Sequence, residues 1–152
     1  MDWSIIFGLV NVVALLCWAA LILLPRSSTL STLIFYVGIG LLCLIYGVLL
    51  VLLLTGAISG AGEAGFTSIE GIRSIFRTDA GVVVGWTHYL AFDLFVGLWI
   101  SRDADNKHFS RWLQAPILLL TFVAGPLGLL VWYVVREPAA RRAARSKRSR
   151  SK

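Results

Sequence analysis

The sequence predicts an all-α integral membrane protein built as a bundle of four transmembrane helices. The chain has 152 residues, of which 58% are hydrophobic and only 14% charged, and its mean hydropathy is +0.82. These values exclude soluble globular domains as a class. About 20 apolar residues are needed to cross a hydrocarbon layer of roughly 30 Å. Four apolar runs reach that length, at residues 3–24, 32–55, 81–100 and 115–135.

The first run opens the chain with the sequence MDWSIIFGLVNVVALLCWAALILLP. No basic segment precedes it and no small-residue cleavage site follows it, which favours a retained helix over a cleaved secretory signal. Cys17 lies in this run and Cys43 in the second, without the spacing of metal ligands. We interpret both as small apolar packing residues and predict no metal site.

The second run is apolar on nearly every face, and glycines that include Gly38 and Gly47 leave one flank open to a close neighbour. In the loop after it, Thr67 and Glu70 match the capping-box pattern, and apolar residues recur every three to four positions. We predict a short helix at 68–77 that lies in the membrane interface. An ordinary capped loop helix is the alternative.

The third run carries two ionisable residues, His88 and Asp93, in the sequence GWTHYLAFDLFVGLWISRDA. At about 100° per residue, their five-residue spacing puts them on different faces of one helix, so each needs a partner on another element. An ionised carboxylate near the bilayer centre costs at least about 2.5–3.5 kcal/mol, so we expect Asp93 to face the bundle interior. A protonated Asp93 could donate a proton there, and a structural acid bonded across helices is the alternative. For His88 the alternative is a neutral imidazole packed among aromatic rings.

The fourth run contains Pro126, which is flanked by Gly125 and Gly128. A proline inside a helix removes one backbone hydrogen bond and displaces the carbonyl four residues earlier, which predicts a kink near residues 122–126. Backbone groups freed at a kink in a membrane need other partners. We expect Asp93 to pair with Tyr89, one turn before it, and with the carbonyls exposed at this kink.

A basic tail at residues 137–152 follows the membrane domain at 1–136. The net charge is +6, and eight of the fourteen Lys and Arg residues lie in REPAARRAARSKRSRSK. Low hydrophobicity predicts that the tail is disordered, and its cations are suited to anionic lipid headgroups. On a chain held in a bilayer we expect no nucleic-acid partner. With four spans the tail, Arg73 and Arg77 share one side, so ten Lys and Arg residues oppose four, and both termini are predicted to be cytoplasmic.

Two blocks, GWTHYLAFDLFVGLWISRDA and LTFVAGPLGLLVWY, resemble the signature of the abscisic-acid-deficient-four-like family, and the resemblance covers about residues 1–136. It is carried by Trp86, His88, Leu90, Ala91, Asp93, Leu94, Phe95, Asp103, Thr121, Gly125, Pro126 and Gly128. The resemblance implies a four-helix membrane protein of a family whose plant members are linked to the formation of neoxanthin from violaxanthin. No Ser- and Arg-rich leader precedes the first run, so we expect a protein of the bacterial inner membrane.

From this resemblance we expect a protein that binds or modifies a carotenoid or another isoprenoid, as an isomerase or as an accessory factor. Asp93 and His88 are the candidate catalytic acid and base, because opening an epoxide to an allene needs both. The candidate ligand-binding residues are Trp86, Tyr89, Phe92, Phe95, Trp99, Asp103 and Pro126. No cofactor is expected, and a homo-oligomer is a further expectation. A non-catalytic membrane scaffold, subunit or lipid-binding module is the alternative function, so whether the chain is an enzyme stays open.

Overall fold

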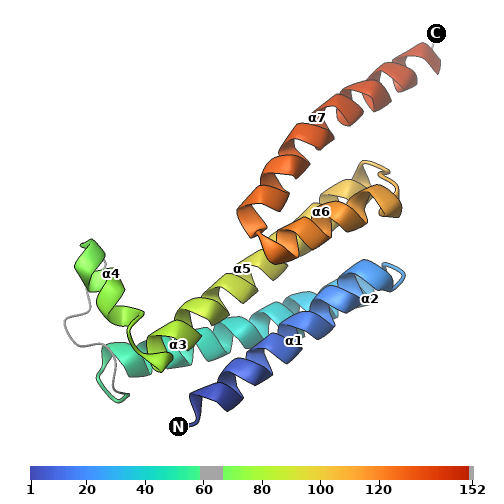
Figure 1. The fold of residues 1–152 in the computed structure, drawn as a ribbon. Helices are drawn as coiled ribbons and strands as arrows, with labels where there is room; N and C mark the ends of the chain where they lie inside the picture. Colours follow the sequence, from blue (N-terminus) through green and yellow to red (C-terminus); the bar gives the residue numbers. More distant parts are fainter. Residues whose placement is uncertain (59–66, 151–152) are drawn as a thin grey trace.

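The computed structural model describes residues 1–58 and 67–150, and within them every regular element is helical (Figure 1). Side chains are placed as far as Pro138. The elements in chain order are α1 (Trp3–Leu23), α2 (Ser28–Leu33), the π-helix η1 (Ile34–Ile39), α3 (Gly40–Leu54), α4 (Ile69–Ile75), α5 (Asp79–Asn106), α6 (Arg111–Val123) and α7 (Gly125–Arg150). The predicted all-α fold class is thereby confirmed.

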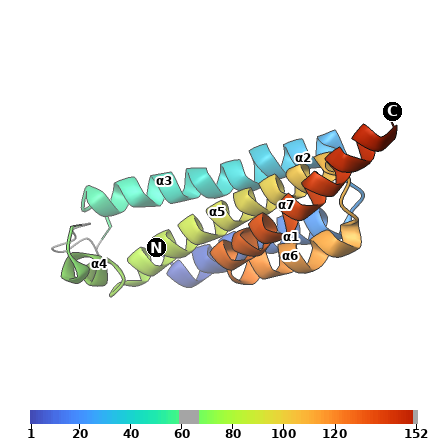
Figure 2. The same ribbon diagram turned by 90° about the horizontal axis from the view of Figure 1, so that it is seen from above.

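Three helices in the described residues are long and apolar enough to cross a membrane. They are α1, the continuous helix from Ser28 to Leu54 that comprises α2, η1 and α3, and α5. They match the first three predicted runs to within a few residues. In its most apolar window α5 is 56% buried, against 22% and 28% for the other two, so α5 is the central helix. Figure 2 shows α5 lying between α3 and the α6–α7 pair.

Close approaches to α1 occur at two glycines. A methyl group at Gly38 of η1 would overlap the Sγ of Cys17, and one at Gly97 of α5 would overlap the ring of Trp18. Small residues at such crossings let helix backbones pack closely in a membrane. The packing roles predicted for Gly38 and Cys17 are confirmed, whereas Gly47 faces open space.

The fourth apolar run does not form a single spanning helix. It is divided at Ala124 into α6 and α7, and α6, with 13 residues, is only about 20 Å long, too short for roughly 30 Å of hydrocarbon. Val123 at the end of α6 contacts Tyr89, in the middle of α5, and α7 then returns until Arg136 lies 3.2 Å from Asp103. The two helices therefore form a hairpin that enters the membrane domain from one end and leaves it at the same end.

The hairpin separates the two ends of the chain. One end of the bundle, called here the α4 end, holds the start of α1, the end of α3 and α4 (Figure 1). The opposite end, called the α2 end, holds α2, the α5–α6 loop and the last turns of α7. The prediction that both termini share a side depends on a fourth spanning helix. In the structure the hairpin turns back, so the N-terminus lies at the α4 end and the end of α7 lies at the α2 end.

Two further elements, α4 and α7, also differ in detail from the sequence predictions. α4 is present within the predicted range 68–77, but its cap is Ser68, whose hydroxyl accepts from the N–H of Gly71, rather than Thr67. Its position relative to a membrane interface stays a prediction. α7 continues as a helix to Arg150, where the sequence analysis expects a disordered tail from residue 137. Alanine, arginine and lysine, which dominate this segment, are strong helix formers and account for the continuation.

Candidate functional site

Asp93 lies in the middle of α5, where this helix meets the tip of the hairpin. Only 7% of the residue is exposed, which confirms that it faces the bundle interior. Gly125, the first residue of α7, packs directly on the carboxyl group, and a methyl group there would overlap Oδ1. Oδ2 is buried and has no hydrogen-bond partner among the described residues. A buried polar atom without a partner costs roughly 1–3 kcal/mol, so a ligand that hydrogen-bonds Oδ2 would gain free energy.

The break between α6 and α7 supplies a second polar group at the same depth. Ala124 leaves the helical region, with φ −150° and ψ 70°, and α7 begins at the next residue. Pro126 explains the restart, since proline lacks the N–H that a continuing helix needs but is favoured in a first turn. The hydroxyl of Tyr89 donates to the freed carbonyl of Val123 at 3.0 Å. The predicted kink is thus a full break, and Tyr89 rather than Asp93 satisfies the exposed carbonyl.

The expected pairing of Asp93 with freed carbonyls is therefore corrected. The carboxyl instead faces the first residue of α7, which is the donor end of that helix. The N-terminus of a helix carries a partial positive charge of roughly half an elementary charge, and it favours acceptors and anions. This environment suits a carboxyl group with one oxygen that accepts a hydrogen bond.

An apolar cavity of about 330 Å³ lies next to this site, between α1, α5 and α6. Tyr89 and Val123 belong to both the cavity wall and the hairpin tip. The remaining lining residues are Asn11, Ala14, Leu15, Trp86, Leu90 and Phe122. The Nε1 of Trp86 donates to Oδ1 of Asn11 at 3.1 Å, and the rings of Trp86 and Tyr89 lie 5.3 Å apart. Two of the predicted ligand residues, Trp86 and Tyr89, are therefore brought together beside Asp93.

His88 lies on another side of α5. Its ring stacks on Phe92 at 4.7 Å and contacts the ring of Tyr46 of α3 at 5.1 Å. The separation of His88 from Asp93 agrees with the five-residue spacing. However, His88 is exposed at the bundle surface rather than buried in the interior. The structure does not bring the candidate acid and the candidate base together.

The other predicted site residues are also distributed along α5. Phe92 and Phe95 are 57% and 45% exposed. Trp99 lies under the guanidinium group of Arg136, at 5.5 Å from ring centroid to Cζ, near the α2 end. Asp103 accepts from the indole N–H of Trp132 at 3.0 Å and therefore binds the protein itself. Pro126 is exposed next to the hairpin tip.

Sequence reasoning missed two buried residues that hold the α2 end together. Gln114, 1% exposed, donates to Oδ1 of Asp105 at 3.0 Å and to the carbonyl of Phe109 at 2.8 Å. Trp132 is fully buried under the Asp103 contact. A glutamine directly before the apolar run at 115–135 was the available signal for the first, because an amide at a membrane segment needs partners. Among the described residues, no group of three or more His, Cys, Asp or Glu side chains could hold a metal ion.

The fold and the site are those of a helical membrane protein, with three helices long and apolar enough to span a membrane and a hairpin whose tip packs on a buried carboxyl group in the middle of α5. A family model described as ABA DEFICIENT 4-like matches residues 5–132. The chain belongs to that family. No curated protein and no solved structure matches it.

Proposed function

We propose that this protein binds an isoprenoid of the carotenoid class within its membrane domain, with an oxygen-bearing end of the ligand at Asp93. The observation that carries the proposal is the buried, unpartnered Oδ2 of Asp93 beside an apolar cavity. Ligand sites are mostly apolar and contain a few polar anchors. Tyr89 in the cavity wall and Asp93, one turn further along α5, are the anchors proposed here. Membership of the ABA DEFICIENT 4-like family supports the ligand class, since it suggests a membrane protein associated with neoxanthin synthesis.

Isomerisation of a bound epoxide is the reaction that these residues suit. The carboxyl group of Asp93 gives its proton to the epoxide oxygen as the C–O bond opens. The resulting carboxylate then takes a proton from the carbon skeleton, so no proton is gained or lost overall. Tyr89 keeps the hairpin tip against the cavity through its bond to Val123. His88, on another side of α5, has no part in this scheme.

A non-catalytic membrane module is the second candidate function. It is favoured by the same contacts, because Gly125 on Asp93 and Tyr89 on Val123 hold the hairpin to α5. In this case Asp93 is a structural acid, and the protein serves as a scaffold, subunit or lipid binder. Variants of Asp93 separate the two functions.

Replacement of Asp93 by asparagine is expected to preserve folding and remove turnover of an epoxidised carotenoid, since the amide still hydrogen-bonds but cannot donate an acid proton. Asp93→Leu should harm folding in either case. The measurement is thermal stability together with chromatographic carotenoid composition, in a host that makes hydroxylated and epoxidised carotenoids. If a well-folded Asp93→Asn protein converts the carotenoid as the parent does, Asp93 has no catalytic role. The non-catalytic membrane module is then the remaining candidate function.

Filling the cavity tests binding separately from turnover. Leu15 lines the cavity and is 52% exposed, whereas Leu9 on the same helix is 60% exposed and lies outside the cavity. The parent protein purified in mild detergent should carry a polyene absorbance. Leu15→Trp should lower bound pigment by on the order of tenfold, the equivalent of about 1.4 kcal/mol, and Leu9→Trp should not. A colourless parent preparation, or equal pigment in both variants, contradicts the proposed site.

We also propose that the α2 end faces the cytoplasm of a bacterial inner membrane. Two Lys or Arg residues of the described chain, Arg73 and Arg77, lie at the α4 end. Eleven lie at the α2 end, namely Arg26, Arg102, Lys107, Arg111 and the seven from Arg136 to Arg150. Cytoplasmic segments carry such an excess of positive charge, and the tail would meet the anionic headgroups of that leaflet.

Reporter fusions test this orientation. A reporter inserted at Asn106 is expected to be cytoplasmic, and a reporter at the N-terminus is expected to lie outside. Four spanning helices with cytoplasmic termini would give the opposite result at both positions. An Asn106 reporter that is active outside the cytoplasm would therefore reject the hairpin topology.

A further inference from the structure

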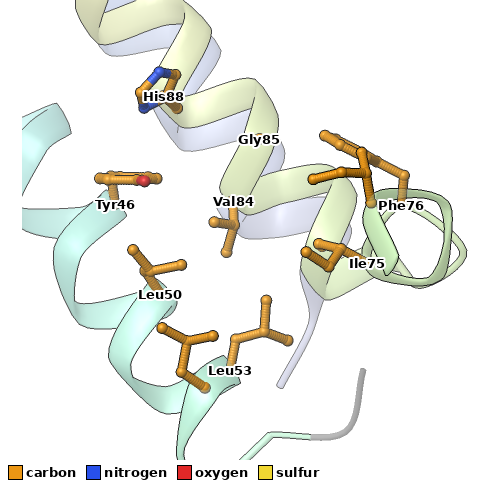
Figure 3. Close-up of a pocket in the computed structure, with 11 residues that line it drawn as sticks. Tyr46, Leu50, Leu53, Ile75, Phe76, Val84, Gly85 and His88 are labelled. Atoms are coloured by element: carbon orange, nitrogen blue, oxygen red, sulfur yellow. The ribbon is translucent and has the colours of Figure 1, made fainter. Parts of the chain in front are cut away.

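A second cavity, with no residue in common with the Asp93 site, lies near the α4 end between α3, α4 and α5 (Figure 3). Its volume is about 270 Å³. Apolar side chains form most of its wall, among them Leu50, Leu53, Ile75, Phe76 and Val84. Figure 3 shows Tyr46 and His88 together at the end of the cavity away from Ile75 and Phe76. The cavity wall is thus apolar except at one edge, where Tyr46 and His88 lie.

Two glycines of α5 hold α4 in the position that closes one wall. A methyl group at Gly81 would overlap the carbonyl oxygen of Ile75, and one at Gly85 would overlap the ring of Phe76. Ile75, the last residue of α4, and Phe76, which follows it, are therefore seated against the backbone of α5. Because one contact involves a backbone carbonyl and the other a stiff aromatic ring, the wall needs little ordering when a ligand binds.

Besides Tyr46, His88 is the polar side chain in the wall of this cavity. No hydrogen bond joins its ring to another described residue, although Tyr46 and Phe92 pack against the ring. Its position on α5 is only about 7 Å along the axis from Asp93, at roughly 1.5 Å per residue. An imidazole in the apolar part of a membrane needs a hydrogen-bonding partner, and a ligand in the cavity can provide one.

The dimensions and chemistry restrict the ligand. A cavity of roughly 150 Å³ holds benzene, so this larger space suits one substituted ring rather than a bare aromatic molecule. The wall offers hydrogen bonds at Tyr46 and His88 alone, which matches a single polar substituent. Leu54 and Phe76 on the rim are 53% and 52% exposed, so a chain attached to the ring could extend into lipid.

We propose that this cavity binds an apolar ring that carries one hydrogen-bonding substituent, with the substituent paired to the His88 imidazole. The proposal is independent of ligand binding at Asp93, because the two cavities share no lining residue. An acyl chain of a membrane lipid and a second copy of this chain are the other possible occupants. The experiment must distinguish them.

Histidine-selective ¹⁵N labelling offers a direct readout, since the chain contains two histidines, His88 and His108. The labelled protein in lipid nanodiscs is titrated with β-ionone, a trimethylcyclohexene ring with one conjugated ketone. The His88 ring signals should shift and saturate. His108, in the α5–α6 loop at the opposite end, should stay unchanged and serve as the internal reference.

Matched variants locate the binding. Leu50→Trp fills the cavity and should weaken the His88 response at least about tenfold, a change of roughly 1.4 kcal/mol. Leu44→Trp places the same ring on the exposed side of α3, outside the cavity, and should leave the response intact. Asp93→Asn should also leave it intact, which separates this result from failure of the Asp93 proposal.

Four outcomes would overturn the proposal. The first is a shift that does not saturate or is equal at both histidines, because partitioning into lipid explains it. The second is a response that survives Leu50→Trp. The third is an equal response to dodecane, which assigns the cavity to acyl chains. A His88 shift that depends on protein concentration without any probe assigns the surface to a second copy of the chain and also rejects the ring site.

Discussion

Gly125→Ala should destabilise the protein by about 1–3 kcal/mol or more, although the change adds a single methyl group. That methyl group would overlap the carboxyl group of Asp93, which is buried between α5 and the hairpin tip. The carboxyl group cannot turn to solvent, and the backbone of α7 would have to move away from α5. The expected result is a lower thermal unfolding midpoint, measured by circular dichroism in detergent.

A double-mutant cycle assigns this effect to the proposed contact. Asp93→Ala removes the carboxyl group, so Gly125→Ala should cost much less in the Asp93→Ala background than in the parent. Gly40→Ala is the control, because a methyl group there meets its nearest atom at an ordinary 3.7 Å and improves helix propensity. If Gly125→Ala is as stable as Gly40→Ala, the hairpin tip does not rest on Asp93.

The parts of this structure that depend on local pattern could be predicted from the sequence. Helical periodicity placed Asp93 and His88 on different faces, and the cost of burying a charge in lipid placed Asp93 inside. Both conclusions depend only on the geometry of a single helix and on the lipid that surrounds it. The three spanning helices likewise follow from the length of their apolar runs.

The hairpin could not be predicted in this way. The apolar run at 115–135 has the composition of a spanning helix, and a single proline often produces only a kink. Whether the chain breaks depends on partners that satisfy the exposed backbone. The decisive partner, Tyr89, is 34 positions away from Val123 in the sequence, and no local pattern links them.

The topology proposed from the structure differs from the sequence prediction through that one element. On a four-span chain the positive charges divide ten to four, and the tail alone sets this bias. With the hairpin the described Lys and Arg residues divide eleven to two, which agrees much better with the charge asymmetry of membrane proteins. The orientation predicted from the positive charges therefore depends on how many helices cross the membrane.

The sequence also did not predict which of the aromatic site residues are buried. In a soluble protein an apolar face indicates the core, but a membrane helix is apolar both toward its neighbours and toward lipid. Phe92 and Phe95 are exposed for this reason, while the cavity beside Asp93 uses Trp86 and Tyr89. Only the packing of α1 and α6 against α5 distinguishes these aromatic positions.

Asp103→Ala should open the outer half of the hairpin and destabilise the protein by about 2 kcal/mol. Oδ2 of Asp103 accepts from the fully buried Trp132 at 3.0 Å and lies 3.2 Å from Nε of Arg136, while Oδ1 lies 3.4 Å from Nζ of Lys107. Alanine leaves a buried indole N–H without a partner and releases two cations. Breaking a fully buried ion pair costs about 3–5 kcal/mol, and the partial exposure of these side chains reduces the effect.

Hydrogen exchange measured by mass spectrometry gives the location of the change as well as its size. Peptides that cover residues 125–136 should exchange faster in Asp103→Ala, while peptides of α1 should not, because Asp103 joins α5 to α7 alone. Asp103→Asn should lie between the parent and Asp103→Ala, since it keeps an acceptor for Trp132 but loses the charge. Glu70→Ala is the control, because its 3.8 Å contact with Arg73 is exposed and such surface pairs contribute little. Unchanged exchange at 125–136 in Asp103→Ala would mean that Asp103 does not hold the hairpin, and that contacts at its tip suffice.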